Sequence, residues 1–201
     1  MEHPVTEAVT GQDLVAWQLA VAEGKPLPLT QDEVVLRGHA VEARLYAEDV
    51  AAGFLPASGP INWLHWPDGV RIDTGVDAGD AVSPYYDPMI AKLIAHAPSR
   101  SEAFACLADA LAALELGPLV HNGPLLLRLC EEPEVLAMGH HTQWPIPTDT
   151  LPVPALAWPL AALWLASREH GASPGSRPQA FGWAPPAALA QRCASARRPA
   201  C

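Results

Sequence analysis

Residues 33–47, EVVLRGHAVEARLYA, constrain the fold more than any other stretch of the chain, because they are rich in β-forming residues and alternate in part. Successive side chains along a strand point to opposite faces of the sheet. One face is expected to hold His39, Val41, Ala43 and Leu45, and the other Ala40, Glu42, Arg44 and Tyr46. A strand here therefore places the carboxylate of Glu42 and the guanidinium of Arg44 on the same face.

Short strands are also expected across residues 53–95, which contain the turn signals PASGP, PDG and DAGD. This pattern favours a compact antiparallel sheet. Before the sheet, we expect Thr10 to cap a helix through Asp13 and Gly24 to end it. One face of that helix is expected to carry Leu14, Trp17, Gln18 and Val21.

Helices are expected again after the sheet. The first is predicted from a capping box, a buried stripe and a terminal glycine: Ser99 with Glu102, then Phe104, Leu107, Leu111 and Leu114, then Gly117. Asn122 is expected to cap a second helix through LLLRLC, and a third is expected from Pro133 to Gly139. An N-terminal helix, a compact antiparallel sheet and C-terminal helices predict an α+β fold and not alternating βαβ units.

Charge is spread unevenly along the 201 residues, since residues 1–150 hold 21 of the 22 acids and 7 of the 12 bases. Residues 151–201 are rich in Ala and Pro and carry an excess of bases. We therefore predict one domain over residues 1–150. Residues 151–201 are predicted to be a low-complexity tail, either a partly disordered linker or the start of a following domain.

Composition also excludes several classes of protein. The net charge of −10 argues against a nucleic-acid surface, and the lack of a run of 18 apolar residues argues against a membrane span. The acidic N-terminus does not resemble a signal peptide. The cysteines have no CxxC spacing and are expected to be reduced, which predicts a cytoplasmic protein: Cys106, Cys130, Cys193 and Cys201.

Glu42, Arg44 and Glu2 are the first candidates for chemistry. A guanidinium is a permanent cation that can stabilise an oxyanion or enolate in a dry pocket. The alternative for Glu42 and Arg44 is an exposed ion pair, which contributes little to stability. Glu2, beside His3, is a candidate general base, and the alternative is a solvated charge at a chain terminus.

Two further runs of polar residues leave their roles open. His140 and His141 suggest a metal site, but no third ligand stands at a diagnostic spacing, so an ordinary loop pair is the alternative. The run YYDPMIAK, residues 85–92, offers an acid and a base and fits a packed strand entry equally well. Periodicity and composition alone therefore predict a soluble α+β domain and no particular reaction.

Four runs taken together resemble one family: MEHPVTEAVTGQDLVAWQLAVAEGKPLPL, RGHAVEARLYAED, GFLPASG and SPYYDPMIAKLI. With nearly consistent spacing over residues 1–146, they are similar to the C-terminal part of biotin carboxylase. That component of biotin-dependent carboxylases carboxylates biotin with ATP and bicarbonate. The form RLYAED resembles the α subunits of acyl-CoA carboxylases, of the acetyl-, propionyl- or methylcrotonyl-CoA type, more than it resembles pyruvate carboxylase.

The resemblance implies roles for particular residues. Glu2 would be the base that deprotonates bicarbonate. Arg44 would bind bicarbonate or carboxyphosphate and stabilise the biotin enolate, and Glu42 would orient Arg44. The backbone of Met1 would lie against bicarbonate, and Trp144 falls near the position that covers the adenine of ATP.

The resemblance also implies cofactors and partners. These are ATP, biotin on a carrier domain, and Mg²⁺, whose ligands in the family belong largely to an ATP-grasp region that precedes these motifs. Residues 1–30 would be the end of that region, so the chain is expected to be N-terminally truncated and inactive alone. The expected partners are the biotin carboxyl carrier domain and the carboxyltransferase subunit, with a homodimer in the complete protein.

Three interpretations of the function stay open at this point. The first is a ligase fragment that supplies half of a biotin carboxylase site. The second is a non-catalytic module that keeps the fold and binds a partner, such as another carboxylase subunit. The third is a relic without a function.

Overall fold

The computed structural model describes residues 2–148; Met1 and residues 149–201 lie outside the described part. The helices are α1 (His3–Thr10), α2 (Leu14–Ala22), the 3₁₀ turn η1 (Gln31–Glu33), α3 (Arg100–Ala113), α4 (Gly123–Glu131) and α5 (Pro133–Leu136). The strands are β1 (His39–Tyr46), β2 (Glu48–Asp49), β3 (Leu55–Pro56), β4 (Gly59–Pro60), β5 (Trp63–His65), β6 (Arg71–Thr74), β7 (Ala81–Val82), β8 (Met89–Ala97) and β9 (Glu115–Gly117). This order of elements confirms the predicted α+β class.

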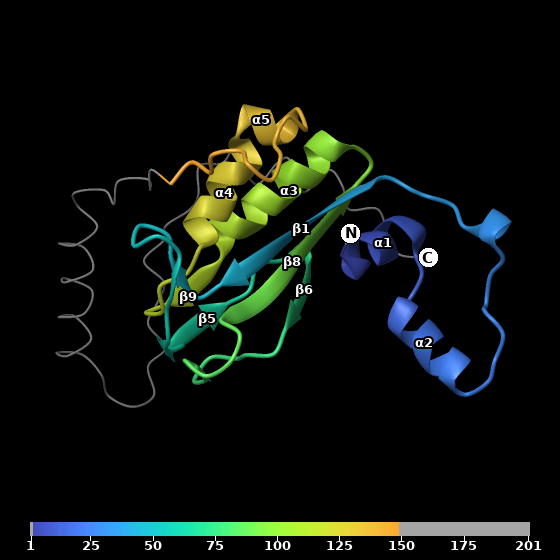
Figure 1. The fold of residues 1–201 in the computed structure, drawn as a ribbon, viewed down its shortest axis with the longest axis horizontal. Coiled ribbons are helices and arrows are strands. Elements are labelled where there is room, and N and C mark those ends of the chain that lie inside the picture. Colours follow the sequence, from blue (N-terminus) through green and yellow to red (C-terminus); the bar gives the residue numbers. More distant parts are fainter. Residues whose placement is uncertain (1, 149–201) are drawn as a thin grey trace. The chain divides into compact units, whose positions relative to one another are not determined.

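The centre of the fold is a three-stranded antiparallel sheet in the order β1-β8-β6 (Figure 1). The strand predicted over residues 33–47 begins only at His39, and its predicted alternation is confirmed, because Ala43 and Leu45 are buried while Arg44 between them is exposed. The other strands pair two by two, as β2 with β3, β4 with β7 and β5 with β9. The antiparallel character predicted for residues 53–95 is therefore confirmed.

Helices α3 and α4 cover the apolar face of this sheet, with α3 packed against both β1 and β8 (Figure 1). The core between them holds the apolar side chains with the least exposure, among them Leu45, Ile61, Ile90, Leu93 and Leu107. Apolar side chains that leave water in this way supply most of the free energy that favours the fold. The predicted capping box is present at the start of α3, where Ser99 and Glu102 bond each other's backbone N–H groups.

The first helix, α1, is absent from the sequence predictions. It starts with Pro4 in its first turn and ends at Gly11, whose φ of 71° and bond from its N–H to the carbonyl of Glu7 form a left-handed cap. Because α1 occupies residues as far as Thr10, the prediction that Thr10 caps the next helix is wrong. Asp13 caps α2 instead, and its Oδ1 accepts from the N–H of Ala16 at 2.8 Å.

Two predicted helix ends are also wrong. Helix α3 ends at Ala113 and not at Gly117, because Glu115–Gly117 form β9 against β5. Helix α5 ends at Leu136, short of Gly139. Asn122 stands at the N-cap of α4, but its side chain makes no capping bond there and turns to β1 instead.

The chain divides into two units, Met1–Thr150 and Leu151–Cys201. Because the second unit lies outside the described residues, the domain boundary expected at residue 150 remains a prediction. The same holds for the predicted low-complexity tail and for Cys193 and Cys201. Cys106 and Cys130 lie within the described part as free thiols. None of the helices formed by residues 2–148 has the length and apolar character needed to cross a membrane.

Candidate functional site

The register of the sheet gathers charged side chains on the face opposite α3 and α4. Arg44 on β1 lies opposite Lys92 on β8, and Lys92 lies opposite Asp73 on β6. In the next row, Glu42 and Arg71 flank β8 from its two sides. Residues that lie opposite each other in a ladder share a face. These charges come from three separate parts of the chain and meet on one surface.

Glu2 and Arg44, the two residues singled out first, lie together in the structure. Nη2 of Arg44 is 2.5 Å from Oε1 of Glu2, and each side chain is about half exposed, at 44% and 47%. Glu2 stands directly before α1, while Arg44 projects from β1. The hydrogen bond from Arg44 is the main cause that lowers the pKa of the Glu2 carboxyl from its ordinary value of 4.5. The pair is therefore an ionised carboxylate and a cation that both remain open to water.

Glu42 is a second carboxylate in this cluster, in a different environment. Its side chain is only 4% exposed, and Oε1 lies 3.7 Å from Nε of Arg44, beyond hydrogen-bond distance. Neither carboxylate oxygen has a hydrogen-bond partner. Burial raises the pKa of Glu42, while the positive charges of Lys92 and Arg44 oppose that rise. Environment thus shifts Glu2 and Glu42 in opposite directions, a pattern typical of sites that do acid–base chemistry.

Lys92 is the fourth charged residue of the cluster formed with Glu2, Arg44 and Glu42. The sequence analysis considered it only as the last residue of the run YYDPMIAK. Its charge lowers the pKa of Glu2 and opposes the raised pKa of Glu42, so it lies within electrostatic range of both carboxylates. In the same run, Tyr85 and Tyr86 are highly exposed, which argues against a packed strand entry at that point. The signal that could have found Lys92 is its position on a strand that pairs with the strand of Arg44.

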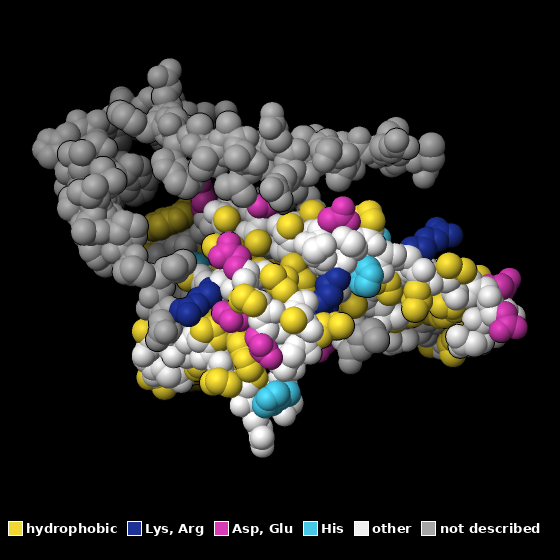
Figure 2. All heavy atoms as spheres, turned by 90° about the horizontal axis from the view of Figure 1, so that it is seen from above, with side chains coloured by type: hydrophobic (Ala, Val, Ile, Leu, Met, Phe, Trp, Pro, Cys, Tyr) yellow, Lys and Arg dark blue, Asp and Glu magenta, His cyan; other side chains and the backbone are white. Residues whose placement is uncertain are grey.

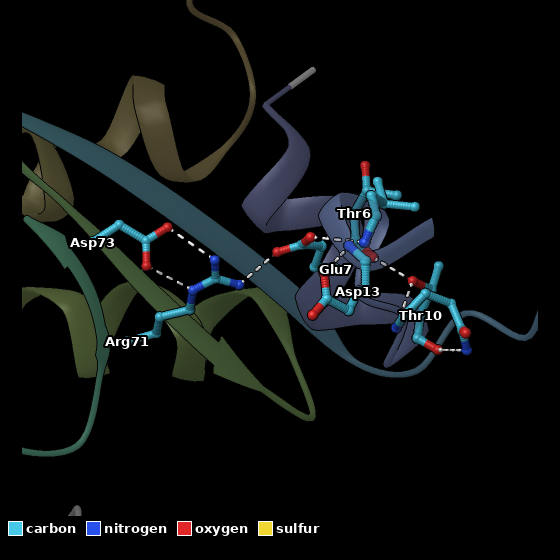
Figure 3. A network of polar contacts seen from close by, with 9 residues as sticks. Thr6, Glu7, Thr10, Asp13, Arg71 and Asp73 are labelled. Atoms are coloured by element: carbon cyan, nitrogen blue, oxygen red, sulfur yellow. Dashed lines mark hydrogen bonds and ion pairs between the residues drawn. The ribbon is translucent and has the colours of Figure 1, made fainter. Parts of the chain in front are cut away.

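A second network holds α1 against the sheet (Figure 3). Arg71 lies between two acids: Nη1 donates to Glu7 at 2.7 Å, while Nε and Nη2 donate to the two oxygens of Asp73 at 2.8 and 2.9 Å. The other oxygen of Glu7 accepts from the N–H of Leu14 at 2.9 Å. Glu7 is buried, and the hydrogen bond from Arg71 is the main cause of its lowered pKa. This network fixes α1 and therefore the position of Glu2 before it.

A cavity of about 610 Å³ borders this second network and not the Glu2–Arg44 pair. Its lining includes Glu7, Gln12, Asp13, Arg71 and His96. Glu7 and Arg71 already bond each other, and Asp13 is engaged as the cap of α2. In Figure 2, acidic, basic and apolar side chains are interspersed over the visible face of the described residues. Short-range contacts around Arg44 therefore define the candidate site better than the cavity or a broad charged patch does.

The remaining predicted residues are placed as follows. Met1 lies outside the described residues. Trp144 lies in a turn after α5, where its backbone N–H donates to the carbonyl of His141. Among residues 2–148 no hydrogen bond or ion pair links Trp144 to Glu2, Glu42 or Arg44. Within the same residues, no group of three or more His, Cys, Asp or Glu side chains is placed to hold a metal ion.

The described part of the chain is similar in sequence to known proteins. Positions 42–145 match the family model of the biotin carboxylase C-terminal domain. The mitochondrial methylcrotonoyl-CoA carboxylase subunit alpha of Arabidopsis thaliana is 49% identical over 145 residues, which is 70% of this chain and 19% of the relative. The chain thus spans about a fifth of the length of that curated relative.

Two solved structures show the same fold. The crystal structure of the biotin carboxylase subunit of a pyruvate carboxylase aligns with a TM-score of 0.66 at 40% identity, over 68% of this chain and 31% of that chain. The biotin carboxylase domain dimer of Hydrogenobacter thermophilus 2-oxoglutarate carboxylase aligns with a TM-score of 0.66 at 35% identity, again over 68% of this chain and 31% of that chain. That dimer was solved in complex with MgADP, ADP and bicarbonate.

Proposed function

The chain belongs to the biotin carboxylase C-terminal domain family, as its motifs predicted, and from this premise we propose that it supplies Glu2 and Arg44 to a biotin carboxylase site. The reaction would carboxylate biotin on a carrier domain with ATP and bicarbonate, as part of an acyl-CoA carboxylase. The observation that carries the proposal is the 2.5 Å contact between Arg44 and Glu2, which joins the two reactive groups in one open cluster.

Arg44 is proposed to bind the anionic substrate and then to stabilise the enolate of biotin. A guanidinium carries five N–H donors, and the contact with Glu2 engages only one end of the group. The side chain of Tyr46 is a second hydrogen-bond partner of Arg44. Because 44% of the Arg44 side chain is exposed, we propose that donors not engaged by Glu2 or Tyr46 bind a planar anion such as bicarbonate. The charge is permanent, so it is present when negative charge develops on the ureido oxygen of biotin.

Glu2 is proposed to accept the proton of bicarbonate. Its lowered pKa keeps the carboxyl ionised, and an ionised carboxyl only accepts hydrogen bonds, so it can receive the bicarbonate O–H. Proton transfer requires that this O–H lies within about 3 Å of the carboxylate. Glu42 is less suited to this task because its side chain is 4% exposed. We propose instead that the buried carboxylate of Glu42 helps to orient Arg44.

Other groups needed for the reaction lie beyond the described residues. Transfer of a phosphoryl group requires clamped phosphates and metal ions, so we derive no step through Mg²⁺ or through the phosphates of ATP. A contact of the Met1 backbone with bicarbonate and of Trp144 with adenine are proposals from the family resemblance alone. Binding to a carrier domain, binding to a carboxyltransferase subunit and formation of a homodimer are likewise proposed from the family resemblance alone. A cytoplasmic location is proposed from the free thiols of Cys106 and Cys130.

The experiment that tests this function is complementation in trans. The 201-residue chain is mixed with a polypeptide that carries an ATP-grasp region of the family, and release of ADP is measured with free biotin and bicarbonate. We expect no turnover from the chain alone, biotin-dependent turnover from the mixture, and loss of that turnover with Glu2→Gln. Turnover that survives both Glu2→Gln and Arg44→Ala would contradict the proposed roles.

A second candidate function, a non-catalytic binding module, is favoured by one observation. Helix α2 has no buried residue, and several large apolar side chains on it and on the segment after it are about half exposed or more: Val15, Leu19, Val21, Leu27, Val35 and Leu36. Apolar surface of this kind is typical of protein–protein contacts. The partner we propose is another part of the same carboxylase, because the chain spans only about a fifth of its curated relative.

The two candidates differ in the outcome of the complementation experiment. If the chain is only a binding module, it associates with the ATP-grasp polypeptide without turnover, and Leu19→Ser weakens the association. If it is the enzyme half, association and turnover appear together, and Glu2→Gln removes only turnover. Lys25→Ser, in the exposed turn after α2, is a matched control that should leave association unchanged.

A further inference from the structure

Asn122, at the start of α4, is bonded to the end of the strand that carries Arg44. Its side-chain Nδ2 donates to the carbonyl of Arg44 at 3.2 Å, and its Oδ1 accepts from the N–H of Tyr46 at 2.9 Å. Its own backbone N–H donates to the carbonyl of Tyr46 at 3.0 Å. Asn122 is only 7% exposed, so these bonds form away from water. A single residue therefore holds β1 on both sides of Leu45.

The position of these bonds in the sheet explains why they matter. Strand β1 is at the edge of the order β1-β8-β6, so one side of its backbone has no strand partner in that sheet. Its pairing with β8 is also irregular between Leu45 and Tyr46, just past Arg44. At this point the strand would be free to twist. The amide of Asn122 replaces the missing partner strand for Arg44 and Tyr46.

We propose that Asn122 is a positioning residue for Arg44, which fixes the backbone so that the guanidinium projects toward Glu2. Only an amide of this length supplies a donor for the carbonyl of Arg44 and an acceptor for the N–H of Tyr46 together. An aspartate offers acceptors without the donor, and alanine offers neither. The catalytic meaning of this inference rests on the proposed role of Arg44, but the positioning itself is measurable without turnover.

The measurement is the titration of Glu2 in the full 201-residue chain, labelled with ¹³C at glutamate carboxyls and assigned with Glu2→Gln. Arg44 is the main cause of the lowered pKa of Glu2, and Lys92 contributes as well. If Asn122 holds Arg44 in place, Asn122→Ala should move the pKa of Glu2 up toward 4.5. Asn122→Leu, which is of similar size, adds no charge and loses both bonds, should move it in the same direction.

A control separates positioning from loss of stability. Ser99→Ala removes the capping box of α3, which makes no contact with Glu2 or with the Arg44 side chain, and should leave the pKa of Glu2 unchanged. If Asn122→Ala does not fold, Asn122→Leu, which fills the same space without a charge, provides the same comparison. An unchanged Glu2 pKa in the folded Asn122 variants overturns the inference. An ordinary Glu2 pKa in the wild-type chain would instead overturn the Glu2–Arg44 pair, and with it the proposed function.

Discussion

Oε2 of Glu7 accepts a hydrogen bond from Nη1 of Arg71 at 2.7 Å, which ties helix α1 to strand β6. Glu7 is a buried carboxylate whose remaining oxygen caps the N–H of Leu14, so both of its oxygens are used. Glu2 stands directly before the same helix. The Glu7–Arg71 pair therefore determines where the carboxylate of Glu2 can meet Arg44, although it lies outside the reactive cluster itself.

Replacing Arg71 with methionine should destabilise the fold, because it leaves the buried Glu7 carboxylate without its charged partner. Removing one member of a buried pair costs several kcal/mol, but the Arg71 side chain is 45% exposed, which reduces the expected loss to about 1–2 kcal/mol. Urea unfolding at pH 7 measures this loss. Lys25→Met, which breaks the exposed Lys25–Glu23 pair, is the matched control and should have almost no effect. Equal effects of the two variants would contradict this account.

The contribution of Glu7 to stability should depend on pH with a definite sign. Its pKa is lower in the folded chain than the ordinary 4.5, because Arg71 and the N–H of Leu14 favour the ionised form. The folded state therefore releases the proton more easily than the unfolded state does. Stability from Glu7 is present in full above about pH 4.5 and is lost as the pH falls through the folded pKa.

The variant Glu7→Gln tests this predicted dependence of stability on pH. The wild-type chain should exceed the variant in free energy of unfolding at pH 7, and the gap should narrow at pH 4 and pH 3. Urea titrations at these three pH values measure it. A gap that stays constant or widens toward low pH would show that Glu7 is not held as a carboxylate.

Glu42→Gln should have the opposite effect on stability. Burial raises the pKa of Glu42 above 4.5, so the folded state favours its protonated form and the ionised form opposes folding. Above about pH 4.5 the wild-type chain must keep a buried charge or bind a proton on folding. Removing that charge with an amide of the same shape should raise the free energy of unfolding at pH 7 by roughly 1 kcal/mol.

The gain from Glu42→Gln should disappear below about pH 4.5, where both folded and unfolded wild-type chains are protonated at this position. Thermal or urea unfolding at pH 7 and pH 3.5 measures the difference. Asp49→Asn, at a half-buried carboxylate on β2 that caps the N–H of Ala52, is a suitable control for loss of an acid elsewhere. A lower stability of Glu42→Gln at pH 7 would mean that the attraction of Arg44 and Lys92 outweighs burial.

Local signals in the sequence predicted much of the fold. The alternation of buried and exposed side chains around Arg44 and the capping box of Ser99 and Glu102 depend on residues that are close together in the sequence. Both could therefore be predicted without a structure. Helix α1 was missed because it is short and carries no long apolar period. The true role of Asn122 was missed because its partners, Arg44 and Tyr46, lie far away in the sequence.

The candidate site was only partly predictable for the same reason. Arg44 and Glu2 were selected through the motifs that resemble the family, and the structure places them in contact. Lys92 joins them through the register of β8 against β1, which no pattern along the chain specifies. The burial of Glu42 depends on packing from several elements, so the strand pattern could place it beside Arg44 but could not distinguish a buried carboxylate from an exposed one.

Arg44→Ala in a complete, active carboxylase should reduce biotin-dependent turnover by about 10²- to 10³-fold, the usual effect of removing a group that stabilises developing negative charge. Arg44→Lys should recover only part of that loss, because an ammonium keeps the charge without the planar set of donors. Neither change should alter the urea midpoint appreciably, since 44% of the side chain is exposed and exposed ion pairs contribute little to stability.

Arg37→Ala is the matched control for the Arg44 variants. Arg37 lies just before β1, and only its backbone takes part in the hydrogen bonds found there, to the carbonyl of Val9 and from the ring of His96. We expect turnover and midpoint to match the wild type. If Arg44→Ala lowers the urea midpoint as much as it lowers turnover, Arg44 acts through the fold and its pairing with Glu2 is structural. Loss of turnover at an unchanged midpoint, absent in Arg37→Ala, assigns the effect to the guanidinium that faces Glu2.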